Sequence, residues 1–198
     1  MRNSRLQHRW ISPAVVYNES ILELEGRIGL HPLVQEDILN TACIKVLFVC
    51  TGNICRSPMA EGLLKKLLLN TPIDSMEIGS AGLIALPGNH ASFNAVRVAQ
   101  ENSINLEEHR ARLVTSDLLA SADLILVMEP RHRQALASRH PEAAEKILLL
   151  RQFARYGSQE RGINDPYGLS LEAYRFCFQD ISECVESLHE WLLAAARN

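Results

Sequence analysis

Short apolar runs alternate with amphipathic stretches along most of the chain, and this alternation limits the possible folds more than any other feature. Apolar runs typical of buried parallel strands occupy residues 44–49, 124–128 and 147–150, and 76–80 is a further short strand candidate. Helical spacing of apolar residues occupies 58–70, 91–102, 116–120, 130–139 and 170–196. Strands that alternate with helices predict a doubly wound α/β fold, with a four-stranded parallel sheet and helices on both faces.

Composition excludes several classes of function. The 198 residues suit one domain, and the formal net charge of -3 gives no basic excess for binding nucleic acid. No apolar run approaches the roughly 18 residues of a transmembrane helix, so we expect a cytoplasmic protein without membrane insertion. The five cysteines are odd in number and lack zinc-finger spacing. We therefore expect free thiols, no structural metal and no cofactor.

Residues 1–43 do not join the alternation, and we interpret them as an N-terminal extension before a domain at 44–198. Short helices are predicted near 20–25 and from Pro32. Residues 29–41 resemble a short stretch of the cytoplasmic domain of CorA-type magnesium transporters, but no transmembrane helices follow, which excludes transport. A fusion remnant, an upstream start-site artefact and a partner-docking extension are all compatible with this segment.

A Cys-x5-Arg-Ser pattern lies between the first strand and the first helix of the domain. In doubly wound folds ligands bind at the carboxyl ends of the strands, which is where this segment falls. Five residues between Cys50 and Arg56 allow the backbone N–H groups to surround one tetrahedral oxyanion, beside the positive end of the helix dipole. Gly52 and Asn53 tolerate unusual backbone angles, and Arg56 can grip two oxygens. The predicted phosphate-binding residues are Thr51, Gly52, Asn53, Ile54, Cys55, Arg56 and Ser57.

Cys50 is the candidate nucleophile in this loop. A helix N-terminus and a neighbouring arginine favour the thiolate form of a cysteine, which attacks phosphorus. The Ser57 hydroxyl can donate to the sulfur and stabilise it as a leaving group. The alternative is an ordinary strand–helix turn with a buried structural cysteine.

The segment VLFVCTGNICRSPMAE (46–61) resembles the signature of the low-molecular-weight protein tyrosine phosphatases. Further matches follow in the expected order at 80–82, 109–112, 122–129 and 165–167. The resemblance implies that Cys50 accepts the phosphoryl group while an aspartic acid protonates the tyrosine oxygen. Water then hydrolyses the phosphocysteine.

The resemblance also implies roles for residues outside the loop. Asp165 corresponds to the catalytic acid, although an Asp-Pro pair is also an ordinary turn former. Tyr167 and Leu86 would line the substrate cleft, and Cys55 would form a protective disulfide with the nucleophile under oxidation, unless it only packs behind the loop. The family's supporting network corresponds to Asn53, Ser57, Ser80 and His109.

The loop after the second strand indicates which group within the family this chain resembles. Many members of the family have an aromatic residue there, whereas this chain reads SAGLIALPG over 80–88. That segment resembles bacterial members paired with tyrosine kinases of capsule and exopolysaccharide export. The implied partner is the phosphotyrosine tail of such a kinase, with the phosphatase as a monomer or weak dimer.

Two rival functions share this loop. Arsenate reductases of the same fold need further cysteines to relay a disulfide, and Cys177 and Cys184 are spaced suggestively; but they lie on one apolar helix face, where core packing is the simpler account. A non-catalytic phosphotyrosine-binding module is the second rival. The presence of Cys50, Arg56 and Asp165 argues against it.

Overall fold

The computed structural model describes residues 43–69, 76–156 and 161–195. The predicted N-terminal extension, with its helices near 20–25 and from Pro32, therefore lies outside the described residues, apart from Cys43. Within the described ranges, no helix combines the length and apolar character needed to cross a membrane.

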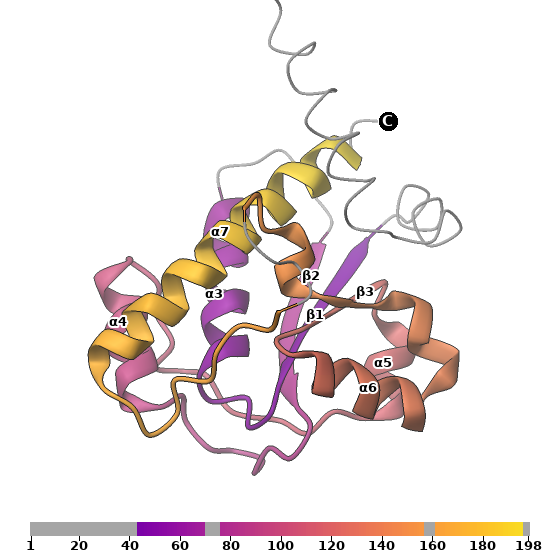
Figure 1. Ribbon diagram of the computed structural model, residues 1–198, viewed down its shortest axis with the longest axis horizontal. Coiled ribbons are helices and arrows are strands. Elements are labelled where there is room, and N and C mark those ends of the chain that lie inside the picture. The colour runs from indigo at the N-terminus through magenta and orange to yellow at the C-terminus, as the bar shows by residue number, and fades with distance from the viewer. Residues whose placement is uncertain (1–42, 70–75, 157–160, 196–198) are drawn as a thin grey trace, which may run out of the picture.

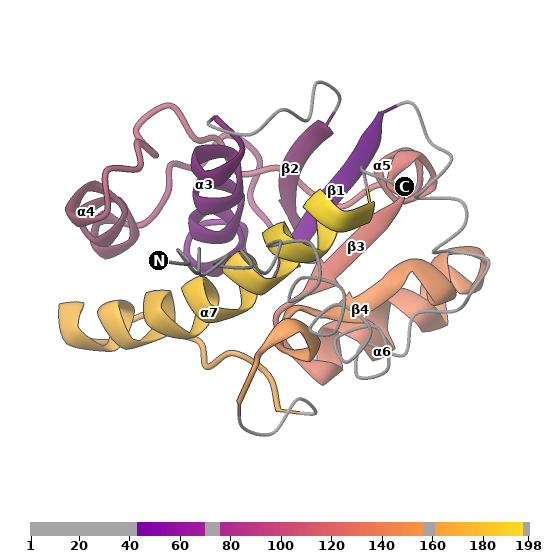
Figure 2. The same cartoon turned by 90° about the horizontal axis from the view of Figure 1, so that it is seen from above.

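A four-stranded parallel sheet forms the centre of the domain, as predicted. Its strands are β1 (Ile44–Cys50), β2 (Met76–Gly82), β3 (Leu124–Val127) and β4 (Ile147–Leu149), in the order β2-β1-β3-β4 (Figure 2). The chain winds outward in both directions from β1. Cys50 is paired with Gly82, so the end of β1 lies directly beside the end of β2.

Helices cover both faces of the sheet (Figure 1). One face carries α3 (Arg56–Leu68), α4 (Phe93–Glu101) and α7 (Leu171–Ala195), and the other carries α5 (Ser116–Ser121) and α6 (Pro130–Arg139). Two 3-10 helices, Pro141–Lys146 and Leu150–Phe153, flank β4. The predicted doubly wound fold is therefore confirmed.

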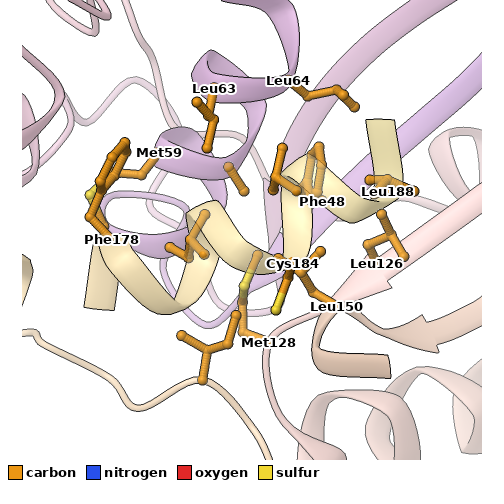
Figure 3. Close-up of a cluster of buried hydrophobic side chains, with 14 of the residues drawn as sticks. Phe48, Met59, Leu63, Leu64, Leu126, Met128, Leu150, Phe178, Cys184 and Leu188 are labelled. Carbon is orange, nitrogen blue, oxygen red and sulfur yellow. The ribbon is translucent and has the colours of Figure 1, made fainter. Parts of the chain in front are cut away.

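Side chains alternate between the two faces along β1. Phe48 points into the larger core, which it shares with Met59 of α3 and with Cys184 and Leu188 of α7 (Figure 3). Val49 points into the smaller core under α5 and α6. Because both faces are covered, β1, β3 and β4 read as largely apolar runs, which is why the sequence located them so closely.

The start of α3 differs from the prediction. A Ser-Pro pair at a helix start predicts a cap at Ser57 with Pro58 as the first helical residue, but α3 begins at Arg56, and its N-cap, Cys55, makes no side-chain capping bond. The Ser57 hydroxyl instead lies 3.0 Å from Cys50 Sγ. Elsewhere hydroxyl caps occur as usual, with Ser92 accepting from Ala95 N and Thr115 from Leu118 N.

Candidate active site

The phosphate loop, residues 50–57, leaves β1 and turns directly into α3. Its left-handed residue is Asn53, with φ 54°, whereas Gly52 does not have a positive φ. Of the two residues predicted to tolerate unusual backbone angles, Asn53 is therefore the one that adopts such an angle. Asparagine tolerates this region because its short polar side chain can bond locally.

A glycine outside the loop, at the end of the neighbouring strand β2, is also needed for the shape of the loop. A Cβ at Gly82 would lie 2.8 Å from both the Asn53 nitrogen and the Thr51 oxygen. Such contacts with backbone atoms cannot be relieved by rotating a side chain. Gly82 therefore allows the end of β2 to pack against the phosphate loop, a role that the sequence did not reveal.

The candidate nucleophile lies at the base of the loop among hydrogen-bonding groups. Cys50 is buried, and its Sγ accepts a hydrogen bond from Asn53 N at 3.3 Å. Ser57 Oγ lies 3.0 Å from the same sulfur and accepts a bond from Asn53 Nδ2 at 2.9 Å. Because that oxygen already accepts, its own proton can be donated to the sulfur, which favours negative charge there.

Asn53 is the centre of the supporting network. Its Nδ2 also donates to Ser80 Oγ at 2.8 Å, and its Oδ1 accepts from Arg112 N at 2.9 Å. His109 Nε2 lies 2.7 Å from the Asn53 carbonyl oxygen. Ser80 in turn donates to Glu61 Oε2 at 2.5 Å. The structure thus brings together Asn53, Ser57, Ser80 and His109, and adds Arg112 and Glu61, whose contributions the sequence analysis missed.

Arg56 lies beneath the pocket and is 1% exposed. Its Nη1 donates to Glu129 Oε1 at 2.5 Å and to the Ile163 carbonyl at 2.9 Å, and its Nη2 donates to Asp165 Oδ2 at 2.6 Å. Burial favours the protonated form of Glu129, but hydrogen bonds from Arg131 and Arg56 outweigh it and lower the pKa of that carboxyl. Buried Nε of Arg56 has no acceptor among the described residues.

A pocket of about 230 Å³ opens above the loop. The phosphate loop forms the floor of the pocket. Three residues, here called the rim, surround its opening: Ile84, Leu86 and Tyr167, whose side chains are 70%, 68% and 66% exposed. Asp165 reaches the pocket from the side. The structure therefore places the predicted acid and both predicted cleft residues around the nucleophile, and adds Ile84 and Asn89 to the lining.

Cys55 lies behind the loop rather than in solvent. Its Sγ donates to Ser92 Oγ at 3.2 Å and lies 3.2 Å from Tyr174 OH, so α4 and α7 both contact it. Burial raises the pKa of the Cys55 thiol and also that of the Tyr174 hydroxyl. Both groups are therefore neutral at pH 7, and Cys55 is a protonated thiol near the nucleophile.

Cys177 and Cys184 are buried within α7, away from solvent. Burial raises the pKa of both thiols, that of Cys184 to about 12. Unlike Cys55, neither thiol lines the pocket that contains Cys50, so neither is placed to take a disulfide from the nucleophile. This placement supports the core-packing interpretation over the arsenate relay.

Two polar residues at the site were not predicted, although their position offered a signal. Glu129 and His132 follow β3 directly, at the carboxyl edge of the sheet where sites form. His132 is 2% exposed, and its Nε2 lies 2.9 Å from Thr51 Oγ1. A polar residue that follows an apolar strand at this edge of the sheet therefore indicates a possible site residue.

Comparison with known proteins identifies one family of phosphatases. The family model described as low molecular weight phosphotyrosine protein phosphatase matches residues 45–197. The low molecular weight protein-tyrosine-phosphatase Wzb of Salmonella typhi is 44% identical over 130 residues, 66% of this chain and 81% of that protein.

Two solved structures are also similar. The tyrosine phosphatase Wzb from Escherichia coli K30 in complex with sulphate has a TM-score of 0.67 and 38% identity, covering 74% of this chain and 96% of that one. The YwlE arginine phosphatase from Geobacillus stearothermophilus has a TM-score of 0.69 and 34% identity, covering 76% and 94%. The similarity therefore extends to phosphatases named for two different phosphoamino acids.

Proposed function

This chain belongs to the low molecular weight phosphotyrosine protein phosphatase family, and from that premise we propose that it hydrolyses phosphotyrosine in proteins through a phosphocysteine on Cys50. The observation that carries the proposal is the position of Cys50 Sγ. The sulfur lies at the centre of a loop that directs backbone and hydroxyl donors at it, with Arg56 beside it. A tetrahedral oxyanion in this loop would lie against the nucleophile.

Substrate binding rearranges the ion pairs of Arg56. Its Nε, buried and without an acceptor among the described residues, is a ready donor for a phosphoryl oxygen. Nη2 is occupied by Asp165, so a dianionic phosphate competes for that donor. Displaced from Arg56, the Asp165 carboxyl is free to take a proton and face the leaving oxygen. Nη1 stays anchored to Glu129 and the Ile163 carbonyl.

Two chemical steps follow. In the first, the Cys50 thiolate attacks phosphorus, the bond to the tyrosine oxygen breaks, and Asp165 gives its proton to that oxygen. In the second, water attacks the phosphocysteine while Asp165 accepts a proton, releasing inorganic phosphate and the thiolate. Ser57 donates to the sulfur as it leaves. The loop N–H groups and Arg56 stabilise the charge on the phosphoryl oxygens in both steps.

The walls of the pocket favour an aromatic substrate. Ile54, Ile84 and Leu86 supply apolar surface, and Tyr167 can stack against a ring. Among the residues lining the pocket, Asp165 is the one carboxylate, and it is paired with Arg56. A phosphoarginine guanidinium would find no carboxylate in this lining besides Asp165, which the proposed mechanism uses as the acid, so we favour phosphotyrosine although one similar structure is an arginine phosphatase.

The protein substrate is proposed from the relatives. Wzb phosphatases and a probable phosphatase named EpsP are among the similar proteins, the latter 37% identical over 142 residues. We propose that this phosphatase acts on the phosphotyrosine tail of a tyrosine kinase of polysaccharide export, in the cytoplasm. Failure to dephosphorylate the kinase encoded with it would contradict this part of the proposal.

Cys55 gives the proposed enzyme a route back from oxidation. Peroxide would convert the Cys50 thiolate to a sulfenic acid; attack by the Cys55 sulfur would then form a disulfide and release water, and a thiol reductant would restore both cysteines. Cys55 must first leave Ser92 and Tyr174. We expect Cys55→Ser to remain active but to recover less activity than wild type after peroxide and dithiothreitol. Equal recovery would remove Cys55 from this role.

The test of the function uses three peptides of one sequence, carrying phosphotyrosine, phosphoserine or phosphoarginine. We expect phosphate release from the phosphotyrosine peptide by the wild type and none by Cys50→Ser. Preferential release from the phosphoarginine peptide would show that the protein is an arginine phosphatase rather than a tyrosine phosphatase. If the reduced enzyme released phosphate from none of the peptides, the proposed catalysis would be contradicted. The alternative of a non-catalytic phosphotyrosine-binding module would then be favoured.

A further inference from the structure

His132 is a buried titratable residue that the proposed mechanism does not use. It lies in the first turn of α6, and its side chain passes under the phosphate loop rather than toward solvent. Its Nε2 is 2.9 Å from Thr51 Oγ1, and its Nδ1 has no hydrogen-bond partner within the described part of the chain. A buried polar atom left without a partner calls for an explanation.

The charges around His132 come from several elements. Glu129 Oε1, just before α6, lies 3.6 Å from Nε2, while Arg56 from α3, Arg131 and Asp165 are further charged neighbours. Burial lowers the pKa of His132 to about 4; Glu129 opposes this shift and Arg56 adds to it. The imidazole is therefore neutral at pH 7 and carries one N–H.

The position of that proton follows from the surroundings. On Nδ1 it would leave a buried donor without an acceptor, which folded proteins rarely tolerate, and would turn the bare Nε2 toward a carboxylate. On Nε2 it is donated to Thr51 Oγ1 and faces Glu129, while Nδ1 is left as an unpaired acceptor, a less costly defect. The Nε2–H tautomer is therefore the one that fits.

With this tautomer, Thr51 Oγ1 is an acceptor, and its own proton is not used by His132. Thr51 lines the pocket and follows the nucleophile directly, so holding its side chain also fixes the backbone next to Cys50. The Thr51 carbonyl is held from the other side, by Ile84 N at 3.0 Å. Thr51 is therefore held at two points: its hydroxyl by His132 after β3, and its carbonyl by Ile84 after β2.

We propose that His132 is a positioning residue for phosphoryl transfer, donating from Nε2 to the Thr51 hydroxyl and thereby holding the first residue of the phosphate loop in its catalytic place. This inference rests on the proposed phosphatase function. It assigns His132 no contact with substrate. Its effect falls on kcat, because the loop must match the charge distribution of the transition state and small displacements there are costly.

Two amide substitutions separate the donor from the bulk of the side chain. His132→Gln can place an amide N–H near the position of Nε2, whereas the amide of His132→Asn corresponds to Nδ1 and falls short of Thr51. We expect kcat on the phosphotyrosine peptide to fall about tenfold in His132→Asn and to stay within about twofold of wild type in His132→Gln. His140→Asn, at the far end of α6, is the matched control and should leave kcat unchanged.

A second variant pair tests the connection to the loop. Thr51→Val removes the acceptor with little change in size, so it should lower kcat about as much as His132→Asn. The double variant should then lose no more than either single variant, because both remove the same bond. Thermal unfolding of each variant identifies any loss that comes only from a smaller folded fraction.

The outcomes distinguish this inference from the proposed function. A wild type inactive on the phosphotyrosine peptide would contradict the phosphatase function itself. An active wild type with His132→Asn unaffected, or with His132→Gln and His132→Asn equally impaired, would overturn the positioning role alone. Additive losses in the double variant would also overturn it, since the two residues would then act separately.

Discussion

The floor and the rim of the pocket are built in opposite ways. The floor is buried and densely bonded: Asn53 and Arg56 are at most 1% exposed, and each makes at least three hydrogen bonds to other parts of the chain. The rim residues Leu86 and Tyr167 are exposed and apolar in their contact surface. Rigid, preorganised donors are suited to stabilising charge, whereas exposed apolar side chains are suited to selecting a partner. We therefore propose that chemistry and substrate choice are carried by separate residues.

The largest effect should come from removing the acid between these two regions. Asp165→Asn keeps an acceptor for Arg56 but cannot donate a proton, so kcat on phenyl phosphate should fall about 10²–10⁴-fold. The loss should be much smaller on p-nitrophenyl phosphate, whose leaving group needs little protonation. Equal losses on the two substrates would show that Asp165 only supports Arg56.

A floor substitution that removes no reacting group should come next. Gly82→Ala places a Cβ against the backbone of Asn53 and Thr51, so we expect the loop to shift and kcat/KM to fall about 10–100-fold. Gly79→Ala on the same strand is the control, because its Cβ would meet only the terminal atoms of the exposed Arg112 side chain, which can rotate away, and no backbone atom. Similar activities for the two variants would mean that the floor tolerates displacement.

Rim substitutions should change binding and leave the chemistry alone. Leu86→Ala removes part of an apolar wall, so KM for the phosphotyrosine peptide should rise about threefold to tenfold with kcat little changed. The inhibition constant of inorganic phosphate, which occupies only the floor, should not move. A parallel weakening of phosphate inhibition would show that rim and floor are not separable.

The smallest effect concerns stability at acid pH. Because the pKa of His132 is about 4 when folded and ordinary when unfolded, the unfolded chain binds more protons between roughly pH 6.5 and 4. The free energy of unfolding should therefore fall as the pH is lowered through this window, by at most about 1.4 kcal/mol per pH unit from this residue. His132→Gln cannot titrate and should show a shallower fall in urea unfolding curves. Identical pH profiles would show that His132 is ordinary in its titration.

The sequence predicted most of the fold and most of the residues that the structure places around the pocket, for a physical reason. Strands buried on both faces are apolar throughout, and a Cys-x5-Arg loop after such a strand has few other uses, so β1 and Cys50 were located directly. Gly82 was not predicted because its importance depends on how β2 packs against the loop. The pairing of His132 with Thr51 joins positions 81 residues apart, and no local pattern encodes such a contact.

The choice between Gly52 and Asn53 was not predicted from the sequence. Both residues tolerate unusual backbone angles, and the loop places the left-handed conformation at Asn53, whose side chain is bonded to Ser80 and Arg112. Here tertiary hydrogen bonds, rather than intrinsic freedom of the backbone, determine which residue takes the strained angle.

The most direct test of the account is to trap the covalent intermediate. The wild type is mixed with a ³²P-labelled phosphotyrosine peptide, quenched within milliseconds in an alkaline denaturant, digested and mapped. We predict the label on the peptide that contains Cys50, with its amount reaching a steady level during turnover and with none in Cys50→Ala. Label on another residue, or rapid turnover with no labelled enzyme under the same quench, would contradict the phosphocysteine mechanism.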